Sequence, residues 1–262
     1  MEEKNAILAI DVQNDFCLPD GNLPVVGAMD DVQRMCDFIR RNSRRIHHIS
    51  STLDSHYPLH IAHQCWWRDK DGNMPGFYTE ITSQDAKDGK WTPQFNPVWS
   101  YKYLEELEKT GQKCTIWPEH CLMGTSGWAL VKEYIDTLIR WQKENFRFYK
   151  FWFKGSNIYT EHYSIFKANV LYPNAPETGL NQELIHVLNE YDNVFLIGEA
   201  QTHCVKNSLN DCNNEAPELA KKIIILEDCM SPIGNFNINT DPVYQKAVSL
   251  GAKIMKSTDV SL

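Results

Sequence analysis

The feature that most constrains the fold of this chain is a series of short, mostly apolar segments. They occur at residues 6–12, 46–53, 113–117, 146–153, 193–198, 222–226 and 252–255. Several of them lack a strict alternation of apolar and polar residues, which is typical of strands buried on both faces. The segments therefore predict the strands of a mainly parallel sheet.

Patterns with helical spacing lie between these segments. Apolar residues recur at helical intervals at Val32, Met35, Cys36 and Ile39, and the ranges 180–188, 203–212 and 242–250 have a similar pattern. Strands that alternate with helices build parallel sheets covered by helices on both faces. We therefore predict a doubly wound α/β fold with three layers.

The length of the chain fits one domain with an insertion. At 262 residues it lies near the upper size of a single α/β domain, so we expect one domain over residues 1–262. The stretch 62–96 is rich in Trp, Asp, Lys, Gly and Pro and has poor periodicity. Such an irregular insertion is typical either of a lid or binding loop or of a solvated excursion.

Charge and composition exclude several partners. The net charge is -8 and its acids and bases are scattered, so no basic surface for nucleic acid is expected. No apolar run approaches the roughly 18 to 20 residues that span a membrane. The start, residues 1–5, is polar and its apolar continuation is too short for a signal peptide, which favours the cytoplasm. The 8 cysteines form no CxxC pair, so we expect reduced thiols.

Reactive side chains follow several of the predicted strands. Asp11 and Lys154 come directly after apolar segments, and Cys204 follows another after a tight turn. Alone, Asp11 could be a turn cap, an acyl-phosphate residue or a metal ligand, Lys154 a surface residue, and Cys204 a buried helix residue. Ligands of open α/β sheets bind at the carboxyl ends of the strands, where these residues would meet. A cysteine at a helix N-terminus beside a lysine and an acid has the groups that lower a thiol pKa and accept its proton.

A second group combines Asp54, His56 and His60 with His120 from a later loop. Residues two apart on an extended segment point to the same side, so Asp54 and His56 could share one ligand face with His120. Two or more imidazoles suit Zn²⁺, Fe²⁺ or Mn²⁺ better than Ca²⁺. The alternative is a solvated aspartate with unrelated loop histidines. His47, His48, His63, His162, His186 and His203 are interpreted as structural or surface residues.

Six motifs follow one another along nearly the whole chain. They are Asp11-Val-Gln-Asn-Asp-Phe16, Ser51-Thr-Leu-Asp54-Ser-His56 with His60, Trp117-Pro-Glu-His120-Cys with Gly124-Thr, Lys154-Gly, Tyr163-Ser-Ile-Phe, and Gly198-Glu-Ala-Gln-Thr-His-Cys204-Val. In this order they resemble the nicotinamidase branch of the isochorismatase-like cysteine hydrolases.

The resemblance implies an isochorismatase-like three-layer fold and a role for each matching residue. Cys204 is the implied nucleophile, Asp11 the proton acceptor and Lys154 the cation that stabilises the thiolate. The backbone N–H groups of Ala200 and Cys204 form the implied oxyanion hole, with a cis peptide near Glu199-Ala200. The implied metal ligands are Asp54, His56 and His120, with His60 as a further ligand or a supporting group. The implied substrate contact is Phe16, against the substrate ring.

The implied activity is deamidation of nicotinamide through a cysteine thioester, in NAD salvage. The implied cofactor is a divalent metal, zinc first, with iron or manganese as alternatives. The expected partner is a small amide, with neither nucleic acid nor membrane, and a homo-oligomer is compatible with the family. Alternatives are a related amidohydrolase acting on a carbamoyl or ureido compound, a vinyl-ether hydrolase, or a non-catalytic scaffold.

Two departures from the family pattern bear on the substrate. Gln201-Thr202-His203 stands before the nucleophile where the family usually has Thr-Asp-Tyr, and Glu161-His-Tyr-Ser stands where it often has Asp-Ser-Tyr-Ser. The insertion falls where the family has substrate-contacting aromatics, so the sequence alone does not place Trp66 and Trp67.

Overall fold

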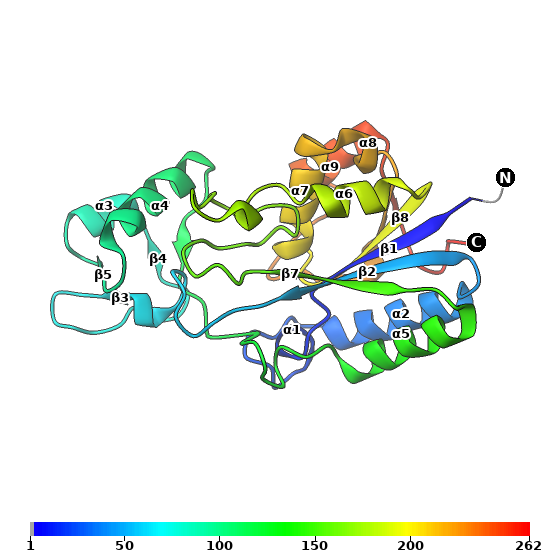
Figure 1. Cartoon of the computed structure of the whole chain (residues 1–262), viewed down its shortest axis with the longest axis horizontal. Helices are drawn as coiled ribbons and strands as arrows, with labels where there is room; N and C mark the ends of the chain where they lie inside the picture. The colour runs from blue at the N-terminus through cyan, green and yellow to red at the C-terminus, as the bar shows by residue number, and fades with distance from the viewer. Residues whose placement is uncertain (1–2) are drawn as a thin grey trace.

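A single six-stranded parallel sheet forms the centre of the molecule (Figure 1). The structure is a computed structural model and describes residues 3–262; Met1 and Glu2, part of the polar start discussed above, lie outside the described residues. The strand order is β10-β9-β8-β1-β2-β7. The bounds are β1 Asn5–Ile10, β2 Ile46–Asp54, β7 Tyr149–Lys154, β8 Asn193–Gly198, β9 Ile223–Leu226 and β10 Lys253–Met255. The predicted doubly wound α/β fold is confirmed.

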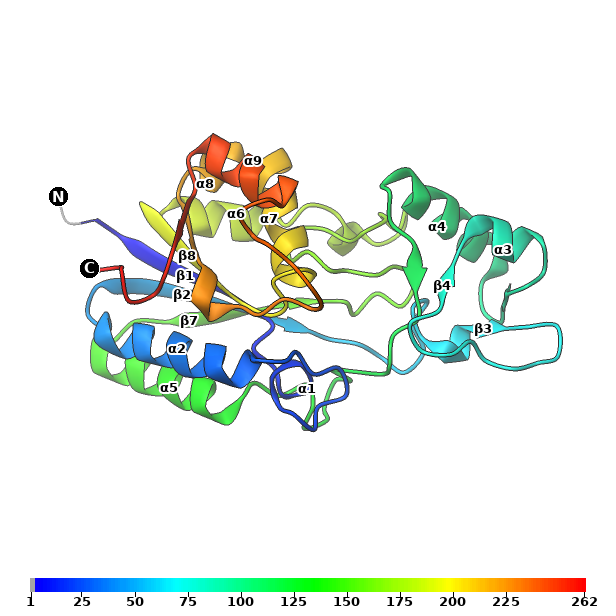
Figure 2. The same ribbon diagram turned by 180° about the vertical axis from the view of Figure 1, so that it is seen from behind.

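Helices cover both faces of the sheet (Figures 1 and 2). One face carries α2 (Ala28–Arg41) and α5 (Lys132–Asn145), and the other carries α6 (Gln182–Asn189), α7 (Cys204–Glu215), α8 (Pro217–Ala220) and α9 (Pro242–Leu250). Shorter elements are α1 (Asn14–Cys17), η2 (Pro176–Thr178) and η3 (Glu227–Cys229).

The continuous apolar run of β1 is explained by its place between two cores. Ile7 and Ala9 belong to the apolar cluster under α2 and α5, whereas Ala6, Leu8 and Ile10 belong to the cluster under the other helices. Successive side chains of a strand point to opposite faces, so a strand between two helical layers needs apolar residues at every position.

An outer lobe, residues 61–117, lies at one end of the molecule (Figure 1). It contains η1 (Gln64–Trp66), β3 (Trp67–Arg68), β4 (Glu80–Ile81), α3 (Ser83–Lys87), β5 (Thr92–Pro93), α4 (Pro97–Lys109) and β6 (Cys114–Thr115). A third apolar cluster, with Trp66 and Trp67 fully buried, holds this lobe together. The predicted strand at 113–117 was wrongly assigned to the central sheet: β6 pairs with β4 in a two-stranded antiparallel sheet, because its apolar residues face the third cluster.

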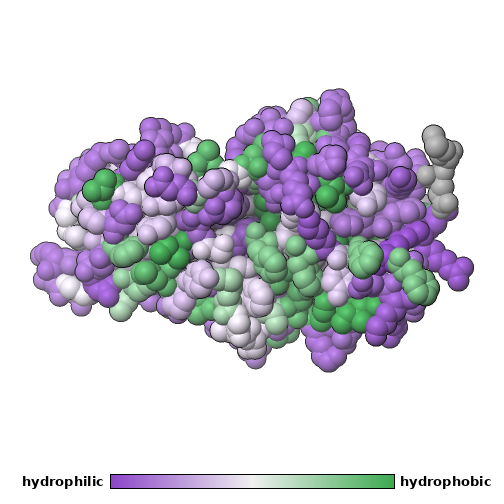
Figure 3. All heavy atoms as spheres, viewed as in Figure 1, coloured by the Kyte–Doolittle hydropathy of each residue, from purple (hydrophilic) through white to green (hydrophobic). Residues whose placement is uncertain are grey.

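Polar residues cover most of the face seen in Figure 3, and apolar residues gather near its middle. Two large apolar side chains are exposed at the edge of the sheet: Phe153 lies in the edge strand β7, and Phe148 directly precedes it. Within residues 3–262 no helix is both long enough and apolar enough to cross a membrane.

Candidate active site

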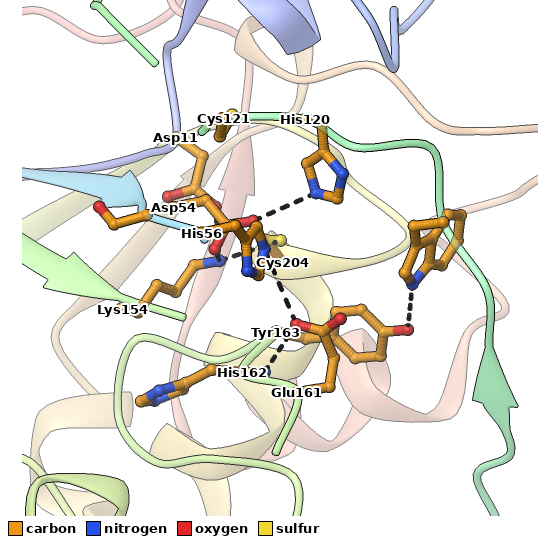
Figure 4. A network of polar contacts seen from close by, with 12 residues as sticks. Asp11, Asp54, His56, His120, Cys121, Lys154, Glu161, His162, Tyr163 and Cys204 are labelled. Atoms are coloured by element: carbon orange, nitrogen blue, oxygen red, sulfur yellow. Dashed lines mark hydrogen bonds and ion pairs between the residues drawn. The ribbon is translucent and has the colours of Figure 1, made fainter. Parts of the chain in front are cut away.

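The carboxyl ends of β8, β1 and β7 bring the predicted reactive residues together; β8 and β1 are neighbours, and β2 lies between β1 and β7 (Figure 4). Asp11 follows β1, Lys154 ends β7, and Cys204 begins α7 after β8. The Lys154 Nζ lies 2.9 Å from Asp11 Oδ2 and 3.5 Å from Cys204 Sγ. The hydroxyl of Thr52 donates a further hydrogen bond to Asp11 Oδ1. We call Asp11, Lys154 and Cys204 the lysine cluster.

The lysine cluster is closed to solvent, and burial governs its protonation. Burial alone lowers the pKa of Lys154, but the carboxylates of Asp11 and Asp54 outweigh it and hold that pKa well above its usual value. Burial raises the pKa of Asp11. Burial also raises the pKa of the Cys204 thiol well above its usual value, and the Lys154 ammonium offsets this only in part. The sequence pattern predicts a lowered thiol pKa, whereas in the folded chain burial, with the carboxylates of Asp11 and Asp54 beside it, raises the pKa of Cys204.

The turn before Cys204 has the form expected of an oxyanion hole. The Glu199–Ala200 peptide is cis, and Ala200 and Cys204 both line the pocket at the cluster. Within residues 3–262, neither of these two backbone N–H groups donates to a protein acceptor. Two free donors beside a cysteine can bind the oxygen of a substrate carbonyl.

A second group, the histidine cluster of Asp54, His56 and His120, adjoins the first. Asp54 Oδ2 lies 3.1 Å from His56 Nε2 and 3.5 Å from His120 Nε2, while Asp54 Oδ1 lies 3.1 Å from Lys154 Nζ. Burial alone raises the pKa of Asp54, but His56 and Lys154 outweigh it and hold that pKa well below its usual range. One atom from each of the three residues can lie within 4.8 Å of the others.

The donor set of the histidine cluster fits a divalent metal ion. The Nδ1 of His120 donates to the Pro118 carbonyl at 2.7 Å, which leaves the Nε2 lone pair free to bind a cation. Gly155 keeps the space open: a Cβ there would lie 2.6 Å from Asp54 Oδ1 and 2.9 Å from His56 Cε1, and its φ of +81° favours glycine. Two nitrogens and one carboxylate oxygen suit zinc and similar transition metals.

Two further histidines lie against this cluster. The ring centroid of His56 is 4.7 Å from that of His60 and 5.6 Å from that of His63. The three rings also form a possible metal-binding group of their own. His60 is one of the residues predicted to lie at the metal site, whereas His63 was interpreted as structural or surface; the signal for His63 is its place in the His60-Ile-Ala-His63 turn.

The pocket at the cluster is lined mainly by rings and apolar side chains. Its walls include the predicted substrate contact Phe16 and several residues to which the sequence analysis gave no role: Trp117, Glu161, Tyr163, His203 and Ile233. The Trp117 indole N–H donates to the Tyr163 hydroxyl at 3.0 Å, which fixes this wall. Among the described residues that line the pocket, neither Trp66 nor Trp67 occurs, because both are buried in the outer lobe.

Glu161 is a pocket residue that sequence reasoning missed. Its side chain is buried and its Oε1 lies 4.0 Å from His56 Nε2, where it also accepts a hydrogen bond from the His162 backbone N–H at 2.8 Å. Figure 4 shows Glu161 turned toward the histidine cluster and the His162 ring turned away from it. The sequence pointed to Glu161 only as the first residue of a motif that departs from the family pattern, and it gave the side chain no role.

The chain is similar to known proteins in sequence and in structure. No family model matches the chain. The chain is 26% identical to the nicotinamidase of Saccharomyces cerevisiae over 229 residues, which cover 87% of this chain and 88% of that protein. The predicted resemblance to nicotinamidases is thereby confirmed.

Two solved structures share the fold. The yeast nicotinamidase bound to the inhibitor nicotinaldehyde superposes with a TM-score of 0.67 at 22% identity, covering 96% of this chain and 99% of that one. The pyrazinamidase of Pyrococcus horikoshii in complex with zinc gives a TM-score of 0.53 at 18% identity, covering 97% and 99%.

Proposed function

We propose that this chain is a cysteine amidohydrolase that deamidates nicotinamide to nicotinate and ammonia, a step of NAD salvage. The observation that carries the proposal is the buried Lys154 ammonium, which lies 2.9 Å from Asp11 and 3.5 Å from Cys204. Cys204 lines the small ring-lined pocket, and the Lys154 ammonium lies between it and Asp11, so a nucleophile, a cation and a proton acceptor stand side by side. The likeness to nicotinamidases supports the choice of amide.

The first half of the reaction forms a thioester. Cys204 gives its proton to the Asp11 carboxylate as the sulfur attacks the amide carbon, and Lys154 stabilises the negative charge that passes between them. The N–H groups of Ala200 and Cys204 hold the oxyanion of the tetrahedral intermediate. Asp11 then returns the proton to the leaving nitrogen, the C–N bond breaks, and ammonia departs.

The second half restores the thiol. Asp11 accepts a proton from a water molecule as that water attacks the thioester carbon, and the same N–H groups hold the oxyanion again. The C–S bond breaks, the sulfur regains its proton from Asp11, and the carboxylic acid leaves. One water is consumed for each amide hydrolysed.

The histidine cluster would hold the metal ion, which we propose is zinc, with iron or manganese as alternatives. When bound, such an ion supplies a positive charge and a site for a neutral nitrogen or oxygen of the substrate. The chain's own contribution is orientation. Phe16 packs against the His120 ring, with centroids 5.3 Å apart, and would form a wall for an aromatic substrate ring.

Ammonia release from nicotinamide tests the proposal. We expect release from nicotinamide and pyrazinamide, loss of release after chelation, and recovery when zinc is added back. A carbamoyl amide serves as the control substrate. Turnover of the carbamoyl amide without turnover of nicotinamide would retain the cysteine chemistry and contradict the proposed substrate; turnover of no amide would contradict the whole proposal.

A further inference from the structure

Two carboxyl groups are buried together behind the turn that carries Ala200. Glu199 follows β8 and is 0% exposed, and Asp31 of α2 is 1% exposed. Glu199 Oε2 accepts a hydrogen bond from the Ser231 backbone N–H at 3.2 Å, and Asp31 Oδ1 pairs with Arg34 at 2.5 Å. The other two oxygens, Glu199 Oε1 and Asp31 Oδ2, are buried and find no donor within residues 3–262. Two ionised carboxylates would leave both oxygens unpaired.

A single proton shared by the Asp31 and Glu199 carboxyl groups would give both of these buried oxygens a hydrogen-bond partner. The Asp31 carboxyl lies close enough to Glu199 to act on its pKa, and a hydrogen bond between two carboxyl groups requires that one of them is protonated. The Arg34 guanidinium is bound to Asp31 and stabilises the negative charge there. Burial, with the Asp31 charge beside it, raises the pKa of Glu199 well above its usual value. A proton on Glu199, donated through Oε1 to Asp31 Oδ2, would give both oxygens a hydrogen-bond partner.

Ser231 links this carboxyl group to the turn from both sides of Ala200. Its N–H donates to the Glu199 side chain, and its carbonyl accepts from the Gln201 N–H at 2.9 Å. Ala200 lies between these two anchored residues, so the direction of its N–H depends on the position of Ser231. That N–H is free and lines the pocket at Cys204.

We propose that Glu199 is a positioning residue for the oxyanion hole: its protonated carboxyl, bound to Asp31, holds Ser231 and so aims the Ala200 N–H at the reacting carbonyl. This inference rests on the proposed amidase function. Loss of the proton would place two negative charges side by side in a buried site. The resulting repulsion would move Glu199 from Ser231 and loosen the turn, so turnover should fall at alkaline pH.

The other titratable and charged groups around Glu199 do not replace this proton. On the elements that surround it they are Asp31 and Arg34 of α2, Cys17 of α1, Asp228 and Cys229 of η3, and Tyr244 of α9. Burial raises the pKa values of Cys17, Cys229 and Tyr244 above their usual values, so these groups stay neutral well into alkaline pH.

Two variants and a pH profile test the role in turnover. Glu199→Leu removes the acceptor of the Ser231 N–H, whereas Glu199→Gln keeps that acceptor and donates to Asp31 through an amide that does not titrate. In folded protein, we expect Glu199→Leu to lower kcat by about 10-fold to 100-fold with KM within about 2-fold, since a misaimed donor costs less than the ~10²–10³ lost with a whole donor. Glu199→Gln should restore kcat and remove the alkaline fall of the wild type.

Three results would overturn the inference. They are full kcat in folded Glu199→Leu, a Glu199→Gln variant as slow as Glu199→Leu, and an alkaline fall that is identical in wild type and Glu199→Gln. If Glu199→Leu lowers the free energy of unfolding but leaves kcat unchanged, the carboxyl pair stabilises the fold and does not position the oxyanion hole, which also contradicts the inference.

A measurement without substrate separates this inference from the proposed function. With ¹³C-carboxyl-labelled glutamate, the wild type should show one glutamic acid carbon that stays protonated at neutral pH, and Glu199→Gln should lack it. If that signal titrates like an ordinary glutamate, the inference fails even where nicotinamide is hydrolysed. If no amide is hydrolysed, the proposed function fails, and the role in turnover fails with it, whatever the signal shows.

Discussion

The lysine cluster and the histidine cluster, both at the carboxyl edge of the sheet, are both buried, but they differ in whether protein groups alone satisfy their charges and lone pairs. In the lysine cluster one ammonium lies within 3.5 Å of two carboxylate oxygens and the sulfur, so each acidic group already has a cation of the protein beside it. In the histidine cluster two imidazole Nε2 atoms point at one carboxylate oxygen, and the His56 Nδ1 is buried without a partner among the described residues. The first cluster is complete as folded, whereas the second is arranged for an added cation.

Asp54 joins the two clusters and makes their difference testable. Its Oδ1 lies 3.1 Å from Lys154 Nζ, while its Oδ2 faces the histidines. A change in the lysine cluster should therefore disturb both catalysis and folding, because it unbalances buried charge. A change in the histidine cluster should act mainly through metal binding.

The largest effect is expected from Cys204→Ala. Removing the nucleophile should lower ammonia release by at least about 10³-fold, because Cys204 is the one cysteine among the described residues that line the pocket. Cys212→Ala is the matched control, since Cys212 is buried in the same helix and does not line the pocket. Activity of Cys204→Ala comparable to that of the control would contradict a covalent mechanism.

Lys154→Met tests whether the lysine cluster balances its own charge. It leaves Asp11 and Asp54 without their shared counter-ion, so we expect loss of activity and a fall of about 3–5 kcal/mol in the free energy of unfolding. Urea denaturation measures the fall. Lys132→Met is the control, because the Lys132 side chain is 86% exposed and its pair with Asp136 should contribute little. Equal stability losses in the two variants would contradict the charge balance.

His120→Ala tests whether the histidine cluster needs a cation. Zinc at a hundredfold excess over Kd should stabilise the wild type by about 2.7 kcal/mol, seen as a rise in Tm. His120→Ala should lose most of this rise, and His186→Ala, whose side chain is 79% exposed, should keep it. An equal rise in all three proteins would place the metal elsewhere.

The central sheet was predictable because its strands are buried on both faces, which leaves apolar runs such as residues 6–10 in the sequence. The outer lobe was not, because its strands have only two residues each and its stability comes from scattered aromatic residues. The helices α4 and α5 also escaped prediction: α4 lies next to the irregular stretch, and α5 immediately precedes an aromatic-rich strand.

The residues of the site also divide into those that the sequence could predict and those that it could not. Asp11, Lys154 and Cys204 could be predicted to meet, because parallel strands bring their carboxyl ends to one edge. Glu161 and Glu199 could not, because their importance depends on contacts with residues distant in the sequence. For Glu199 these partners, Asp31 and Ser231, lie in a helix and a loop that no sequence pattern connects to the turn.

The smallest effect is expected from His60→Ala, which distinguishes a ligand from a supporting group. The Nδ1 of His60 accepts from the Ala62 N–H at 3.2 Å, and its Nε2 donates to the Thr160 carbonyl at 3.2 Å. Burial, reinforced by the neighbouring charge of His56, lowers the pKa of His60 well below its usual value, so the ring is neutral with both nitrogens engaged. A ring in this state has no lone pair left for a metal ion.

We therefore expect His60→Ala to change the Kd for zinc far less than His120→Ala does. It should instead lower the free energy of unfolding by about 1–3 kcal/mol, because the Ala62 N–H and the Thr160 carbonyl lose their buried partner. Zinc titration with urea denaturation measures both quantities in one set of variants. A loss of zinc affinity as large as in His120→Ala would make His60 a ligand, and would mean that its backbone hydrogen bonds break when the metal binds.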